Sequence, residues 1–407
     1  MTAPLAHIRV LDLSRILAGP WAAQFLADMG AEVLKVERPG EGDDTRGWGP
    51  PFARDSSGDD PGMSAYFLCA NRGKKSVTID MATAQGQALI RQLAAKCDVL
   101  IENFKVGGLA KYGLDYASIK AINPGIVYCS ITGFGQTGPY AQRAGYDFLV
   151  QGMGGLMSVT GEPDDVAGGG PVKVGVAISD QTAGMNALAG ILAALVRRER
   201  TGEGDHIDVA LLDATVSSLI NQASTHLVAG TVPGRMGNAH PTVVPYQAFA
   251  TAQGHIILAI GNDGQFARFC KAADLAELGG DPRYATNTQR ILNRATLIPQ
   301  IAAALKTRTA AAWIALFEPL AVPVGPINTI DQVFEDRQVK ARHMRRTLSH
   351  PEVGPLPVVA NPVRMASHDT TAPKAPPLLG EDTEEVLRDV LGLNAVEIAA
   401  LRSGGVV

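Results

Sequence analysis

The sequence predicts an α/β protein in which helices cover a parallel sheet, with a second domain further along the chain. Short β-branched segments alternate with helical segments over the first half, and this alternation is typical of parallel strands joined by helices. The 407 residues, 46% hydrophobic and 19% charged, supply enough apolar side chains for two or three domains with cores of their own. The 44 glycines and 25 prolines indicate tight connections. This composition excludes disordered and fibrous architectures.

The chain opens with a β-α-β unit. An apolar strand at His7–Leu13 is followed by a loop at Ser14–Gly19. The next helix is expected to begin near Pro20, because proline is favoured in the first turn of a helix, and to end at Gly30. A second β-branched strand covers Glu32–Val36, so the two strands are expected to belong to one parallel sheet.

The same alternation continues to about residue 228. After a glycine-rich polar stretch, Gly152–Gly170, a strand at Val172–Ile178 is expected to lead into a long apolar helix. Further strands are predicted at Ser76–Ile79, Asp98–Glu102, Ile126–Ile131 and His206–Val209, and helices at Ala84–Cys97, Asp180–Arg198 and Ala210–Val228.

A polar stretch rich in glycine and proline, Thr231–Tyr246, marks the entry to the second domain. That domain is expected to cover about Gln247–Val324 and to contain a strand at His255–Ile260 and three helices. The tail is expected to hold a strand and turn at Val353–Met365, an extended proline-rich segment at Ala372–Pro377 and a last helix from Asp382.

Charge and hydropathy argue against several classes of function. The net charge is −4 and no dense block of Lys and Arg occurs, so nucleic-acid binding is not expected. The longest strongly apolar run, Ala187–Val196, has ten residues, whereas a membrane span needs about 20. The N-terminus lacks a basic region followed by an apolar core, which argues against a secretory signal. We therefore expect a cytoplasmic protein.

The cysteines and histidines follow no metal or redox pattern. The eight histidines include no HExxH pair, so no metal site is predicted. A GxSxG elbow, the usual sign of a serine hydrolase, is missing as well. Four cysteines are too far apart in sequence for a zinc or redox motif and are interpreted as buried thiols: Cys69, Cys97, Cys129 and Cys270.

The first β-α-β unit invites a comparison with dinucleotide-binding proteins. Glu37 stands at the end of the second strand, where a ribose-binding acid would lie. However, the first turn carries only Gly19 and lacks the three-glycine fingerprint that lets a pyrophosphate approach the backbone. NAD binding is therefore the weaker interpretation, and Glu37 is interpreted as the solvated end of a strand.

Asp180 is the residue with the clearest chemical potential. It follows a predicted strand and opens a helix rich in small residues, so its carboxylate should lie at the positive end of the helix dipole and stay ionised. A partly desolvated carboxylate in that place can attack an activated acyl group. An aspartate at this position can equally be a simple N-terminal cap, and the residue spacing leaves both interpretations open. Likewise, residues 261–265 are either a mobile flap or a plain hairpin or helix-entry turn.

Eight segments, spread from the first strand to the tail, resemble those of one enzyme family. They are Leu11–Pro20, Gly30–Arg46, Asn71–Ser76, Glu102–Phe104, Thr132–Pro139, Gly145–Asp147, Ser179–Gly184 and Pro377–Thr383. Together they are far more specific than any single short motif. The sequence thus resembles the class III (CaiB/BaiF-type) CoA-transferases, and within that family it is most similar to members that act on dicarboxylates such as glutarate.

The resemblance implies a fold that residue spacing does not show. It implies a large Rossmann-like α/β domain built from residues 1–228 and 326–407, with a smaller α+β domain inserted at 229–325. It further implies a homodimer whose ring-shaped subunits interlock. Neither a nucleic acid nor a membrane is an expected partner.

The resemblance also implies a reaction. CoA would move from an acyl-CoA donor such as succinyl-CoA to a free acid such as glutarate or 3-hydroxy-3-methylglutarate. The carboxylate of Asp180 would form an aspartyl anhydride and then an aspartyl-CoA thioester, with water excluded from the site. Coenzyme A is then a substrate, and no permanently bound cofactor is implied.

Most of the implied site residues contact CoA. They are Ile16, Leu17, Ala18, Arg38, Asn71, Arg72, Lys74, Lys75, Asn103, Phe104, Lys111, Thr132, Gly133, Phe134 and Gly135. Among them, Arg38, Lys75 and Lys111 suit the phosphate charges of CoA.

A smaller set would face the acids. Arg15, Arg46 or Arg72 could hold the distal carboxylate of the acceptor through a bidentate pair. The acyl pocket would be bordered by Tyr146, His240, Tyr246, Gly261 and Gly264.

Departures from related enzymes narrow the choice of reaction. Formyl-CoA transferases carry a glutamine where this chain has Leu17, a glutamate near Gln136 and an all-glycine flap at residues 261–264, so formate and oxalate are poor candidates. The α-methylacyl-CoA racemases of the same fold carry a histidine where this chain has Tyr146, and tyrosine is a poor base near neutral pH. An acyl-CoA racemase is thus the alternative enzymatic function. The non-enzymatic alternative is a CoA-binding or scaffold protein that has lost catalysis.

Overall fold

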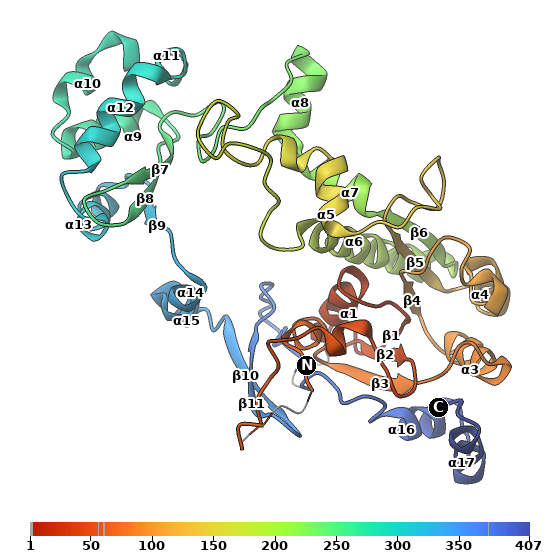
Figure 1. Ribbon diagram of the computed structural model, residues 1–407. Helices are drawn as coiled ribbons and strands as arrows, with labels where there is room; N and C mark the ends of the chain where they lie inside the picture. The colour runs from red at the N-terminus through yellow and green to blue at the C-terminus, as the bar shows by residue number, and fades with distance from the viewer. Residues whose placement is uncertain (1–2, 56, 60–61, 373) are drawn as a thin grey trace. The chain divides into compact units, whose positions relative to one another are not determined.

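The computed structural model describes residues 3–55, 57–59, 62–372 and 374–407, and two compact units are distinguished among them. The first unit consists of residues 1–156, 174–224 and 337–407, and the second of residues 157–173 and 225–336. Figure 1 follows the chain by colour and labels the elements.

A six-stranded parallel sheet forms the centre of the first unit, as the alternating pattern predicts. Its strands are β1 (Arg9–Asp12), β2 (Glu32–Glu37), β3 (Lys74–Thr78), β4 (Val99–Glu102), β5 (Val127–Thr132) and β6 (Asp205–Ala210). The spatial order is β3-β2-β1-β4-β5-β6, the doubly wound order in which the direction of winding reverses between β1 and β4. Ligands of such sheets bind outside the carboxyl ends of the strands at this reversal.

Helices cover both faces of this sheet. One face carries α1 (Ala18–Asp28), α5 (Asp147–Met153), α6 (Ile178–Thr201) and α7 (Leu211–Ser218), and the other α3 (Ala84–Ala94), α4 (Tyr116–Ile122), α16 (Thr383–Asp389) and α17 (Ala395–Ser403). Consecutive strand residues point into the two cores in turn: Val10 is buried under the first set of helices and Leu11 under the second. Because both faces are covered, consecutive apolar residues are buried in the central strands, as Val99, Leu100 and Ile101 are in β4.

The tail returns to the first unit beside β3. It contains α15 (Arg337–Ala341) and an antiparallel hairpin of β10 (Arg345–His350) and β11 (Gly354–Val359), and it ends in α16 and α17. The backbone N–H of Asp382 donates to the carbonyl of Ser76, and that of Asp80 donates to Val406. A short helix, α2 (Ala65–Leu68), precedes β3.

The second unit has a core of its own around a three-stranded antiparallel sheet, β7-β8-β9. Its elements are β7 (Tyr246–Ala250), β8 (His255–Ala259), α9 (Asp263–Ala272), α10 (Ala276–Gly280), α11 (Asn287–Leu292), α12 (Arg294–Leu305), α13 (Ala310–Phe317), β9 (Val324–Pro326) and α14 (Ile330–Glu335). Helix α8 (Ile220–Ala229) spans the division between the units.

Several predicted elements differ from the structure. The strand expected at Val172–Ile178 is wrong: Val172 and Val176 are 52% and 60% exposed, and Ile178 already begins α6. The helix expected to run through Ala210–Val228 breaks into α7 and α8 where Ile220 adopts a φ of +44°. The second unit has more than three helices, and the last predicted helix is two, α16 and α17. No helix in the described ranges is long and apolar enough to cross a membrane.

Candidate active site

A cavity of about 300 Å³ opens where the winding of the sheet reverses. Its walls come from the loops that follow β1, β4 and β5, from the segment before α5 and from the first turn of α6. The lining residues include Arg15, Ile16, Leu17, Ala18, Asn103, Phe104, Lys105, Thr132, Gly133, Arg143, Tyr146, Asp147 and Asp180. The cavity thus brings together ten of the residues expected at the site, Asp180 among them.

Polar side chains at the strand ends fold these loops into the cavity wall. Asp12 ends β1, and its Oδ1 accepts the backbone N–H of Ser14 at 3.0 Å. Glu102 ends β4, and its Oε2 accepts the N–H of Phe104 at 2.7 Å. The hydroxyl of Thr132, at the end of β5, accepts from Gly135 at 2.9 Å. Each acceptor turns the chain within two or three residues of the strand end, so the following residues reach the cavity.

The segment after β1 is held on several sides. The side-chain oxygen of Asn103 accepts the N–H of Arg15 at 2.9 Å, and its amide donates to the carbonyl of Arg15 at 2.7 Å. The N–H of Ile16 lies 3.3 Å from both carboxylate oxygens of Asp43. Ile16 itself adopts a φ of +73°, a region that β-branched residues rarely enter.

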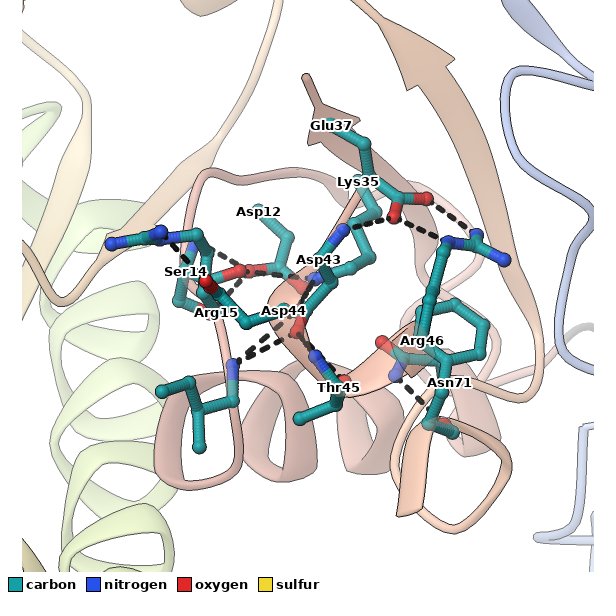
Figure 2. A network of polar contacts seen from close by, with 12 residues as sticks. Asp12, Ser14, Arg15, Lys35, Glu37, Asp43, Asp44, Thr45, Arg46 and Asn71 are labelled. Carbon is teal, nitrogen blue, oxygen red and sulfur yellow. Dashed lines mark hydrogen bonds and ion pairs between the residues drawn. The ribbon is translucent and has the colours of Figure 1, made fainter. Parts of the chain in front are cut away.

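A buried network of charges lies behind this segment (Figure 2). Nζ of Lys35 donates to Asp43 at 2.8 Å and to the carbonyl of Ser14 at 3.0 Å, and both charged side chains are fully buried. Burial disfavours the charge of Asp43, but the Lys35 ammonium outweighs it and lowers the pKa of Asp43 to about 2. The pKa of Lys35 is raised, since the nearby carboxylates overcome the effect of its burial. The pair therefore stays ionised at neutral pH.

Glu37 is not the solvated strand end that was expected. Arg46 binds its carboxylate with two nitrogens at 2.7 and 2.6 Å (Figure 2), and Ser76 donates to it at 2.6 Å. Glu37 is only 4% exposed because Arg46, stacked 3.7 Å from the ring centroid of Phe67, covers it. The interpretation of Glu37 as solvated is therefore wrong, and the guanidinium of Arg46 is engaged by this carboxylate.

The cationic side chains of the segment after α2 also have partners inside the fold. Arg72 pairs with Asp28 through nitrogens at 2.9 and 2.5 Å, and both side chains are buried. Lys74 is fully buried and donates to Asp12 and to Asn71, each at 2.9 Å. Burial lowers the pKa of Lys74 to about 8 against the opposing charge of Asp12. None of these side chains lines the cavity at Asp180.

Of the remaining expected CoA contacts, Arg38, Lys75 and Lys111 lie on more open surface, whereas Phe134 is buried. Arg38 pairs with Glu41 at 2.8 Å and lines a second cavity of about 310 Å³, which shares Arg15 and Phe104 with the first. Lys75 pairs with Glu32 and Glu385 on the outside of β3, and Lys111 lies over the ring of Tyr112. Phe134 packs edge-on against Tyr140.

Asp180 lies in the first turn of α6, at its third residue, and the N-terminal cap is Ala177. Of the two interpretations left open for Asp180, the simple N-terminal cap is therefore wrong: the helix starts earlier, where Asp147 accepts the N–H of Ser179 at 2.8 Å. The small residues of α6 allow close contact with α1, and a side chain at Gly184 would lie 2.7 Å from the carbonyl of Ala18. This contact brings the first turn of α6 to the segment after β1.

The carboxylate of Asp180 is half-buried and has no hydrogen bond or ion pair within the described part of the chain. Burial raises the pKa of Asp180 to about 7, and the charge of Asp147 adds to the effect. The expectation that the helix dipole keeps Asp180 fully ionised is thus wrong, because desolvation outweighs it. A carboxylate without hydrogen bonds to stabilise its charge is suited to nucleophilic attack.

The sequence-based predictions did not single out Arg143 and Asp147, which line the cavity, or Tyr66 and Trp48, which lie near it. The pKa of Tyr66 is raised to about 12 by burial and by the charge of Asp180. The ring of Trp48 packs edge-on against Tyr66, with centroids 5.1 Å apart. Asp147 belongs to the motif Gly145–Asp147, which carries part of the family resemblance and is the signal that could have revealed its role.

The acyl-site residues expected beyond residue 229 belong to the second unit. The rings of His240 and Tyr246 lie 5.2 Å apart. The N–H of Gly261 donates to Gln265 at 2.7 Å, and Asn262 caps α9 by accepting the N–H of Gln265. Residues 261–265 therefore form a helix-entry turn, the plainer of the two interpretations.

Two expectations about cysteines and metals can be compared with the structure. Cys97, Cys129 and Cys270 are buried thiols, but Cys69 is exposed, so the interpretation of all four as buried is wrong for Cys69. Within the described ranges, no group of three or more His, Cys, Asp or Glu side chains could hold a metal ion.

Comparisons with known proteins agree on one family. The family model described as CoA-transferase family III matches residues 5–383. A protein of Agrobacterium fabrum named succinate–glutarate CoA-transferase is 48% identical over 387 residues, covering 95% of this chain and 96% of the relative. A mouse protein named succinyl-CoA:glutarate CoA-transferase is 44% identical over 404 residues, covering 99% and 90%. A CaiB/BaiF family crystal structure from Brucella suis matches with a TM-score of 0.84 at 48% identity, covering 96% and 100%.

Proposed function

This chain belongs to CoA-transferase family III, and from that premise we propose that it moves CoA from succinyl-CoA to glutarate with Asp180 as the nucleophile. The observation that carries the proposal is the carboxylate of Asp180, which lines a cavity at the reversal of the sheet and has no partner among the described residues. The names of the relatives from Agrobacterium fabrum and mouse support the pair of acids. A second acceptor to be tested is 3-hydroxy-3-methylglutarate.

The proposed reaction consists of four nucleophilic substitutions at carbonyl carbons, and Asp180 takes part in each of them. Its carboxylate attacks the thioester carbonyl of succinyl-CoA, the C–S bond breaks and CoA leaves as a thiolate, so a succinyl-aspartyl anhydride forms. The thiolate then attacks the aspartyl carbonyl, releasing succinate and leaving an aspartyl-CoA thioester. Glutarate attacks this thioester to give a glutaryl-aspartyl anhydride and a thiolate. Attack of the thiolate on the glutaryl carbonyl yields glutaryl-CoA and restores Asp180.

The two adjoining cavities suit a long thioester substrate. The reacting end of CoA would lie at Asp180, and the nucleotide would reach the second cavity at Arg38, past the shared residues Arg15 and Phe104. The backbone around Ile16, Leu17 and Ala18 would flank the pantetheine, as the family resemblance implies. Closing the cavity around these intermediates would protect them from water.

The guanidinium groups differ in their freedom to bind the distal carboxylate of the acceptor. Arg46 and Arg72 are engaged by Glu37 and Asp28 inside the fold. Arg15 lines the cavity, and its partner, Asp44, is 44% exposed. Arg143 also lines the cavity, stacked over Tyr140 at 4.6 Å. We assign the distal carboxylate to Arg15 and Arg143, because charge-assisted pairs with guanidinium select a second carboxylate.

We further propose that the protein is a homodimer with interlocked subunits, as the resemblance implies. Exposed apolar side chains on and after α8 support a partner subunit there: Ile220, Leu227, Val228 and Val232 are 73 to 87% exposed. Such surface is uncommon on a monomer. Light scattering should report twice the mass of the 42.7 kDa chain. A stable monomer would contradict the dimer.

The decisive experiment mixes the protein with succinyl-CoA and a panel of free acids and identifies new acyl-CoA species by mass. The panel contains glutarate, 3-hydroxy-3-methylglutarate, malate, mesaconate, oxalate and carnitine. Glutaryl-CoA formed by the parent protein and missing with Asp180→Ala is the expected result. If no acid reacts but Asp180 is trapped as an acyl or CoA adduct, succinyl-CoA acts as a donor, the chemistry stands and the acceptor lies outside the panel. The protein would instead be a racemase if neither product nor adduct forms and the α-carbon of a 2-methylacyl-CoA takes up deuterium in heavy water.

A further inference from the structure

Ile16 has an unusual backbone conformation at the wall of the Asp180 cavity. Its φ of +73° lies in the left-handed region, where a β-branched side chain is strained. Such strain persists only where the surroundings hold it, and it is concentrated at functional sites. The conformation of Ile16 therefore needs a specific support.

The support is a carboxylate from another loop. Both oxygens of Asp43 lie 3.3 Å from the N–H of Ile16, and Oδ1 also accepts the N–H and the hydroxyl of Thr45 at 2.9 and 2.7 Å. Lys35 binds Asp43 at 2.8 Å and the carbonyl of Ser14 at 3.0 Å (Figure 2). The ion pair thus binds the chain on both sides of Arg15, at the carbonyl of Ser14 and at the N–H of Ile16.

The ion pair between Lys35 and Asp43 holds this segment strongly because it is shielded from solvent. The side chains of Lys35 and Asp43 are both 0% exposed, and electrostatic interactions are stronger where water is excluded. Neither residue lines the cavity at Asp180, so neither can contact the reacting end of a substrate there; both border the second cavity, where the nucleotide would lie. Their influence on that cavity has to pass through the segment they hold.

We propose that the Lys35–Asp43 ion pair is a positioning device that keeps Ile16 in the left-handed conformation and thereby sets the cavity wall opposite Asp180. The inference rests on the proposed function in taking Asp180 as the reacting carboxylate. Lys35 and Asp43 are positioning residues in this mechanism. Without the pair, Ile16 relaxes to a negative φ and the segment Arg15–Ala18 moves away from the place where it flanks the thioester.

The test removes the pair without leaving a buried charge alone. Lys35→Met with Asp43→Leu replaces the two charges by apolar chains of similar size, a change that buried ion pairs often tolerate in stability. The kcat for transfer should fall on the order of 10²-fold, the loss that a displacement near 1 Å causes. The double substitution should also be made in the Ile16→Gly variant. There it should lower kcat much less than it does in the parent, because glycine enters the left-handed region without the support of the ion pair. A role in stability alone would not allow this rescue.

A matched control separates positioning from general damage. Asp98 also accepts a backbone N–H, that of Arg9 at 2.7 Å, and pairs with Arg198, but it lies just before β4, at the amino ends of the strands and away from the cavity. Asp98→Asn should lower the melting temperature with little change in kcat. The inference is overturned if the Lys35/Asp43 variant keeps the parental kcat, or if it is folded and Ile16→Gly relieves none of its loss.

A readout that does not require turnover keeps this test distinct from that of the proposed function. Hydrogen exchange of the segment 14–17 should be slow in the parent, fast in the Lys35/Asp43 variant and parental in Asp98→Asn. If the parent transfers CoA to no acid, the proposed function fails while the exchange pattern still decides the positioning role. Unchanged exchange in the Lys35/Asp43 variant would refute it.

Discussion

The carboxylates of Asp147 and Asp180 interact at the first turn of α6. That of Asp147 is hydrogen-bonded, whereas that of Asp180 has no partner among the described residues. Asp147 accepts the N–H of Ser179 at 2.8 Å and the amide of Gln151 at 2.7 Å. Its negative charge adds to burial in raising the pKa of Asp180 to about 7. The neighbour that starts the helix thus also disfavours ionisation of the proposed nucleophile.

Asp147→Asn tests this relationship. The variant keeps an oxygen that can accept from Ser179 but removes the charge that opposes ionisation of Asp180, so the pKa of Asp180 should fall while burial keeps it above its ordinary value. The acidic limb of kcat/KM against pH should therefore move to lower pH. An acidic limb at the parental pH would show that Asp147 does not influence Asp180.

Asp180→Asn should separate activity from stability. Transfer should fall about 10⁴-fold or more, as on loss of a nucleophile. The pKa of Asp180 is raised on folding, so its ionisation destabilises the fold as pH rises from its ordinary value towards about 7. The variant should then unfold at a higher temperature than the parent at pH 8, and the difference should shrink at pH 5. Equal differences at both pH values would contradict the raised pKa.

Arg15→Gln and Arg143→Gln should each weaken selection for dicarboxylates. A charge-assisted hydrogen bond contributes about 1.5–3 kcal/mol, so KM for glutarate should rise roughly 10- to 100-fold. KM for pentanoate, which has the same carbon chain and one carboxylate, should change little. The control is Arg346→Gln on β10, whose partner is Asp369 and which does not line the cavity. Equal changes for both acids would remove the assigned role.

Asp28→Asn tests whether the pair with Arg72 is structural. Asp28 accepts from two nitrogens of Arg72, from Asn361 and from the backbone of Ala372, and it is 2% exposed. Weakening this buried pair should lower the free energy of unfolding by on the order of 3 kcal/mol, measured by urea titration. KM for succinyl-CoA should stay near the parental value. A large rise in that KM without loss of stability would instead favour CoA binding by this segment.

The cavity could be anticipated in part because parallel strands end at one edge of a sheet. The residues after β1, β4 and β5 are far apart in sequence, yet the alternation of strands and helices requires them to meet at that edge. The resemblance added Asp180 to this group. The segment at 172–178 failed as a strand because its two exposed valines have no sheet beside them, and a short apolar run does not reveal that.

The burial of Glu37 depends on segments that no local pattern connects to it. Arg46 reaches both Glu37 and the carbonyl of Pro377, and the N–H of Gly380 donates to Ser76, itself a donor to Glu37. The covering segment arrives more than 300 residues later in the chain. From the local sequence alone, a buried acid at the end of a strand therefore cannot be distinguished from a solvated one.

The sequence by itself determined the parallel α/β architecture, the family and the candidate nucleophile, because periodicity and motifs are local properties of the chain. Only the tertiary structure decided which charges pair, why Asp180 resists ionisation and which arginines remain at the cavity. Ion pairing and desolvation depend on the segments that pack around a group, and this packing exists only once the chain has folded.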